Sequence, residues 1–108
     1  MNLPTEIFGD VIVVHTPEEL AADSADEFQT FVTALERVQV IVDMDGTESI
    51  DSAGLTALLD AQEILRELHG DLKISTTNEI NHSLLSITRL DQQLEVFDSV
   101  IDAVKSFA

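Results

Sequence analysis

The sequence predicts a single α/β domain with a largely parallel sheet. Strand-like and helix-like segments alternate along its 108 residues, which is the pattern of parallel strands joined by helices. The run from Val40 to Met44 is rich in β-branched residues and is typical of a strand buried on both faces. No repeat, linker or low-complexity segment divides the chain, so we expect one domain over residues 1–108.

A β-hairpin is expected at the start. Glu6 to Phe8 and Val11 to Val14 flank Gly9-Asp10, which suits a two-residue turn. The sequence His15-Thr16-Pro17 then ends the second strand. A helix follows, capped by Asp23 or Ser24 and running to about Arg37. Its apolar stripe has helical spacing and consists of Phe28, Phe31, Val32 and Leu35.

The strand Val40 to Met44 leads into a second helix. Ser52 stands before this helix, and Gly70 provides a C-terminal stop. Ala57 and Ala61 allow close packing. The predicted buried face is supplied by Leu55, Leu58, Leu59, Leu65 and Leu68.

Two more strand–helix units complete the predicted fold. A strand from Leu72 to Ser75 precedes a helix from Asn78 to Leu90, and a strand from Leu94 to Phe97 precedes a last helix capped by Asp98 or Ser99. The apolar positions of the third helix are Ile80, Leu84, Leu85 and Ile87. The core side of the last helix is expected to be Val100, Ile101, Val104 and Phe107.

The charge of the chain limits its partners. With 21 acidic and 5 basic residues the formal net charge is −16, which argues against nucleic-acid binding and against attraction to anionic membranes. A basic protein is the natural complement, although the composition alone favours a simple role in solubility. There are no cysteines, and neither a signal peptide nor an apolar run of about 20 residues is found. We therefore expect a cytoplasmic protein without membrane insertion.

One interpretation of residues 40–59 makes the protein an enzyme. Asp43-Met44-Asp45-Gly46-Thr47 resembles the first motif of haloacid-dehalogenase-like phosphatases. That resemblance implies Asp43 as nucleophile and Asp45 as general acid/base, with Mg²⁺ between the carboxylates and the substrate. The later motifs are missing: Glu48 stands where the family has an apolar residue, and Lys73 comes too early for the family lysine. The simpler interpretation places both carboxylates in solvent at the end of a strand.

The second interpretation makes it a binding partner. Ile50-Asp51-Ser52-Ala53-Gly54-Leu55, between a buried strand and a Leu-rich helix, resembles the signature of STAS domains, the family of bacterial anti-sigma factor antagonists. The likeness covers roughly residues 7–107. It departs from the family at Glu18-Glu19-Leu20-Ala21, where many members have Gly-Glu-Leu-Asp, and at Thr76-Thr77-Asn78, where an apolar residue and a proline are usual.

The STAS resemblance implies a mixed, mostly parallel sheet of four to five strands with four helices mainly on one side. It implies a non-catalytic protein without cofactor, which a serine-kinase anti-sigma factor binds and phosphorylates on Ser52 and which a phosphoserine phosphatase resets. The implied partner surface is Glu48, Ser49, Asp51, Ser52, Ala53, Gly54 and Thr56. Alternatively, the domain is a subunit of a membrane lipid-transport complex and binds an ATPase subunit.

The residues around Ser52 support these expectations independently. The Ser52 hydroxyl is placed to cap the following helix, and an ordinary cap is the simplest role for it. The N–H groups of Ala53, Gly54 and Leu55 form a positive helix start, which suits a phosphate. Gly54 should leave the surface open, so that Gly54→Arg keeps the fold. The three histidines, which show no ligand spacing, are expected at the surface: His15, His69 and His82.

Overall fold

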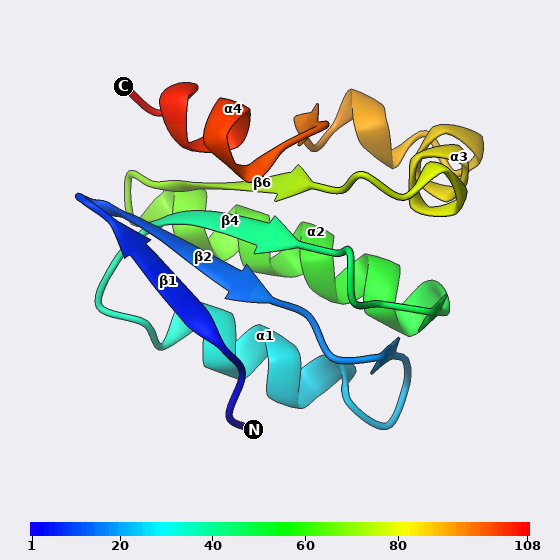
Figure 1. Cartoon of the computed structure of the whole chain (residues 1–108). Coiled ribbons are helices and arrows are strands. Elements are labelled where there is room, and N and C mark those ends of the chain that lie inside the picture. Colours follow the sequence, from blue (N-terminus) through cyan, green and yellow to red (C-terminus); the bar gives the residue numbers. More distant parts are fainter.

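A five-stranded sheet in the order β1-β2-β4-β6-β7 forms the centre of the computed structural model, which describes all of residues 1–108. The hairpin strands β1 (Thr5–Phe8) and β2 (Val11–His15) are antiparallel. β4 (Gln39–Asp43), β6 (Asp71–Ser75) and β7 (Val96–Phe97) continue the sheet in parallel with β2 (Figure 1). The predicted mixed, mostly parallel sheet is confirmed.

Helices cover both faces of this sheet unequally. α1 (Ala25–Thr33) and α2 (Ser52–Glu67) pack side by side on one face, and α3 (Glu79–Ile87) joins the same core through Leu85. α4 (Val100–Lys105) lies on the other face, next to β4, β6 and β7 (Figure 1). None of the helices combines the length and the apolar character needed to cross a bilayer.

The core follows from the alternation of side chains along the strands. On the α1–α2 face, Val14, Val42 and Ile74 belong to the main cluster of 18 buried residues. On the other face, Val13 and Ile41 pack against Ala103 of α4 in a second cluster. Each fully buried side chain of this size stabilises the fold by about 1.5–3 kcal/mol. The central strands are therefore apolar on both faces, as the sequence predicts.

Helix and strand ends differ from the predictions by several residues. α1 ends at Thr33 instead of near Arg37, although Leu35 still packs against the core. α3 ends at Ile87, because Arg89 takes a left-handed conformation with φ 61° and Leu90 belongs to a separate short 3₁₀ turn, Leu90–Gln92. Leu94 is fully buried but lies before β7 rather than in it. Leu35, Leu90 and Leu94 are therefore fixed by burial in the core and not by membership of the predicted helix or strand.

Two predicted core residues lie at the surface. Leu68 is 51% exposed because α2 ends at Glu67 and the chain turns at His69, whose φ is +68°. Ile101 is 52% exposed, since the buried residue of α4 is Ala103. The apolar positions Ile80 and Ile87 of α3 are exposed as well.

Candidate functional site

The loop before α2, residues 44–51, is fastened to the segment before α1. A small parallel sheet joins β3 (Glu19–Leu20) to β5 (Ser49–Ile50) beyond the carboxyl ends of the main strands. Backbone N–H groups of Glu48 and Ser49 donate to the Glu18 carbonyl at 2.8 and 3.2 Å. The 44–51 loop thus has defined backbone partners and holds the start of α2 in a fixed place.

Buried threonine hydroxyls support this loop from below. Thr47 is 2% exposed, donates to the Pro17 carbonyl at 2.8 Å and hydrogen-bonds with the Thr16 hydroxyl. Thr16 in turn reaches the Asp43 carbonyl at 3.2 Å. Sequence reasoning missed Thr16 and Thr47, because a threonine beside a tight turn is common and nothing in the sequence shows that the two segments meet. A buried polar group left without its hydrogen-bond partner would lower the stability of the fold by about 1–3 kcal/mol.

Asp51, and not Ser52, caps α2. One carboxylate oxygen of Asp51 accepts from the Gly54 N–H at 3.0 Å, and the other accepts from the Ala22 N–H at 3.1 Å. Ser52 is the first residue of the helix. The predicted cap is therefore one residue off, and the Asp51 carboxylate, which was predicted to touch a partner, joins two segments of the fold. The Gly54 N–H is the main cause that holds the pKa of Asp51 below its usual value.

Removing this cap should lower the stability of the domain by an amount that depends on pH. We expect Asp51→Ala to lower the urea midpoint of unfolding, while Asp51→Asn keeps most of it, because Asn also caps well. A carboxyl whose pKa is lowered on folding stabilises the fold above its unfolded pKa, and this contribution is lost as the pH falls through the folded pKa. The advantage of wild type over Asp51→Asn should therefore shrink in acid, when both are unfolded in urea at stepped pH. An advantage that grows in acid would contradict the cap.

Ser52 itself is free of this network. Its side chain is exposed, and the hydrogen bonds at the helix start are made by Asp51 instead. The Gly54 N–H bonds the Asp51 side chain and the Leu55 N–H bonds the Asp51 carbonyl, so only part of the predicted positive helix start is open. The Ser52 hydroxyl is thus available for chemistry without loss of the cap.

Gly54 is buried, contrary to the expectation of an open surface. A Cβ placed on Gly54 would lie 2.1 Å from the Leu20 carbonyl oxygen and 2.8 Å from a side-chain carbon of Ile50. Glycine is required here because the first turn of α2 packs directly against the backbone of β3. The prediction that Gly54→Arg keeps the fold is therefore wrong.

The other predicted partner-binding residues divide between surface and interior. Glu48, Ser49 and Thr56 are exposed, and Ala53 is half-buried. Ser52, Ala53 and Thr56 line a groove of about 390 Å³ between the starts of α1 and α2. This groove, rather than a deep cavity, is the concave surface at the predicted site.

The two aspartates of the enzyme interpretation do not lie free in solvent. Asp43 is 9% exposed, with its carboxylate 3.0 Å from Nδ1 of His15, and it also accepts from the Asp45 N–H. The Asp45 carboxylate accepts from the hydroxyls of Thr76 and Thr77 at 3.0 and 3.1 Å. Each carboxylate therefore has a structural partner. The expectation of a solvent-facing group is wrong for Asp43, which is buried, whereas Asp45 is exposed as expected.

The other residues considered for a phosphatase or metal site are Lys73 and the three histidines, and most of them also have structural partners. The Lys73 ammonium donates to Ser106, the C-cap residue of α4, and lies 4.2 Å from the centre of the Phe107 ring. His15 also contacts Glu6 at 3.0 Å, and His82 contacts Asp98 at 3.1 Å, so both are half-buried rather than plain surface residues, whereas His69 is exposed. No three His, Asp or Glu side chains gather as a metal site would need.

Comparison with known proteins identifies the family of the chain. The model of the STAS domain matches residues 2–103. The chain belongs to the STAS domain family. Its similarity to relatives is distant but extends over nearly the whole chain. An anti-sigma factor antagonist homologue of Thermotoga neapolitana is 26% identical over 94% of this chain and 94% of its own length.

Solved STAS structures share the fold. The crystal structure of an anti-sigma factor antagonist from Thermotoga maritima has a TM-score of 0.84 at 23% identity, covering 96% of this chain and 92% of that one. The phosphorylated form of the Bacillus cell-fate determinant SpoIIAA has a TM-score of 0.72 at 12% identity, covering 99% of this chain and all of that one. At these identities the structures establish the fold. The STAS assignment made from the sequence is confirmed.

Proposed function

We propose that this STAS domain is a non-catalytic regulator that binds a protein partner at the start of α2 and is released by phosphorylation of Ser52. One observation carries the proposal: Ser52 is exposed at the first position of a fixed helix whose cap is a different residue, Asp51. The names of the relatives support it, since they describe anti-sigma factor antagonists, and one solved neighbour, SpoIIAA, is described in a phosphorylated form.

In the proposed reaction this chain supplies only the phosphoryl acceptor, the Ser52 hydroxyl. A serine kinase would transfer the terminal phosphoryl group of its ATP to Oγ of Ser52, which loses its proton, while ADP leaves. A phosphate at the start of a helix is favoured by the helix dipole, so the fold should persist. It would stand beside Glu48 and Asp51, and this added negative charge would oppose an acidic partner surface.

The partner proposed is a serine-kinase anti-sigma factor, and a phosphoserine phosphatase would reset the switch in the cytoplasm. The contact surface would comprise exposed residues at the end of the 44–51 loop and the start of α2, together with the half-buried Ala53: Glu48, Ser49, Asp51, Ser52, Ala53 and Thr56. Gly54 would contribute by shaping this surface and not by contact, because it is buried.

Phosphate mapping in the native host tests the proposal directly. We expect mass spectrometry of the tagged protein to find phosphate on Ser52, and Ser52→Ala to abolish the modified form. Ser49→Ala and Thr56→Ala are the matched controls, since these residues flank Ser52 and are exposed as well. Phosphate that persists in Ser52→Ala, or an ATPase subunit captured with the protein while Ser52 stays unmodified, would overturn it.

A further inference from the structure

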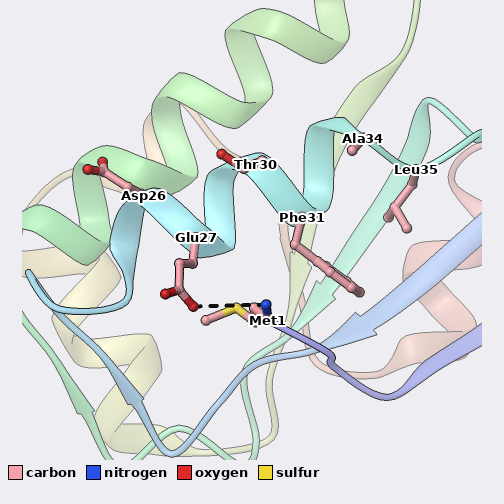
Figure 2. Close-up of a pocket in the computed structure, with 7 residues that line it drawn as sticks. All are labelled: Met1, Asp26, Glu27, Thr30, Phe31, Ala34 and Leu35. Atoms are coloured by element: carbon pink, nitrogen blue, oxygen red, sulfur yellow. Dashed lines mark ion pairs between the residues drawn. The ribbon is translucent and has the colours of Figure 1, made fainter.

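The largest groove of the molecule lies on the outer side of α1, away from Ser52. It has a volume of about 530 Å³ and is mainly apolar (Figure 2). Two rows of side chains at a spacing of four residues line it, and Met1 closes one side. These rows are Asp26, Thr30 and Ala34, and Glu27, Phe31 and Leu35.

The groove is apolar at one end and acidic at the other. Phe31 and Leu35 are half-buried and pack against the core, and Figure 2 shows the Glu27 carboxylate pointing towards Met1. Asp26 and Glu27 form the acidic end, where the only opposite charge is the terminal amino group, 4.0 Å from Glu27. No lysine or arginine occurs in α1. An apolar floor with an unbalanced acidic end is an unusual feature on so charged a surface.

We infer that this groove on α1 is a docking site for an amphipathic basic helix of a protein partner. The groove between two rows spaced by four residues accepts a matching row of another helix, crossing at about −50°. Apolar side chains of that helix would cover Phe31 and Leu35, and an arginine or lysine would meet Asp26. A second copy of this chain, at net charge −16, or an anionic membrane would bring negative charge to the acidic end instead.

The position of Asp26 connects this groove with the predicted site. Asp26 lines both the α1 groove and the smaller groove that contains Ser52. A helix lying along α1 would therefore end close to the start of α2. The inference does not depend on phosphorylation, because its test uses the unmodified chain.

Peptide titration followed by NMR tests the inference. The probe is a stapled helical peptide with two leucines one turn apart and two arginines a further turn along. We expect chemical-shift changes concentrated in residues 26–35 of the ¹⁵N-labelled protein, weakened by salt. The same peptide with glutamates in place of the arginines should bind at least about tenfold more weakly, because the charge contact with Asp26 becomes repulsive.

A pair of protein variants separates docking from general charge attraction. Thr30→Lys puts a long cation between Asp26 and Ala34 and should weaken binding about tenfold, without harm to the helix, because Lys is a better helix former than Thr. Ser86→Lys changes the net charge equally on exposed α3 and should change binding less than about twofold. Equal binding by Thr30→Lys and wild type, or shifts centred elsewhere, would overturn the inference. Shifts of residues 26–35 with protein concentration alone would assign the groove to a second copy and overturn it too.

Discussion

Gly54→Ala is expected to destabilise the domain by about 1–3 kcal/mol, although alanine is the better helix former by about 1 kcal/mol. The new Cβ would stand 2.1 Å from the Leu20 carbonyl oxygen. The same oxygen accepts a hydrogen bond from the Asp51 N–H at 3.3 Å. The backbone cannot rotate away as a side chain can. The first turn of α2 and β3 must therefore move apart, and Gly54→Arg should be worse still.

Gly46→Ala is the matched control, since it makes the same chemical change in the 44–51 loop just before α2. Its Cβ would meet only the Thr16 carbonyl oxygen, at an ordinary 3.7 Å. We expect a change within about 0.5 kcal/mol. Far-UV circular dichroism in urea is the suitable probe, because the chain has neither tryptophan nor tyrosine. Equal midpoints for Gly54→Ala and Gly46→Ala would show that β3 does not pack against the helix start as described.

Ser52→Asp is expected to fold like wild type and to bind the partner about 100-fold more weakly, which corresponds to about 2.7 kcal/mol. Ser52→Ala should bind normally and stay bound in the presence of the kinase. Both variants should fold because Asp51, not Ser52, caps α2, and an acidic residue in the first turn suits the helix dipole. Titration calorimetry with the partner recovered from the native host measures both affinities.

Ser86→Asp adds the same charge on exposed α3 and should leave that affinity within about twofold. If Ser52→Asp were folded and as tightly bound as Ser86→Asp, the phosphorylation switch would be wrong. The stability of Ser52→Ala does not separate a capping role from a switch role, because the cap of α2 is Asp51.

Periodicity was enough to predict an α/β domain with a largely parallel sheet, and the resemblance to STAS domains added the mixed sheet with helices mainly on one side. The β-branched strand at Val40 and the Leu-rich helix after Ser52 are recognisable in the sequence, because their burial repeats with the period of the element. Errors gathered near the ends of elements. Leu68 continues the apolar pattern after α2 has ended, and Ile101, the second residue of α4, is half exposed because Ala103 is the buried residue of that helix. Local sequence does not show how much of a helix its neighbours in the fold will bury.

The predicted partner site stays a prediction, but two of its residues have other roles in the fold than the sequence suggested. Asp51 and Ser52 are both good N-cap residues, and only the pairing of β5 with β3 decides which of them stands at the helix start. Gly54 looked like an exposed helix residue because the sequence cannot show Leu20 across from it. Asp43 became buried for the same reason, since its partner His15 comes from the neighbouring strand β2.

The fastening of the 44–51 loop to β3 bears on the timing of the proposed switch. The loop and the helix start are joined to the segment before α1 by three sets of hydrogen bonds. These are made by the Asp51 carboxylate, by the backbone N–H groups that donate to Glu18 and by the buried Thr47 hydroxyl. Bound and released forms of this chain would then share one backbone shape and differ only in the phosphate. No slow rearrangement would precede recognition, so the response time of the circuit would be that of its kinase and phosphatase.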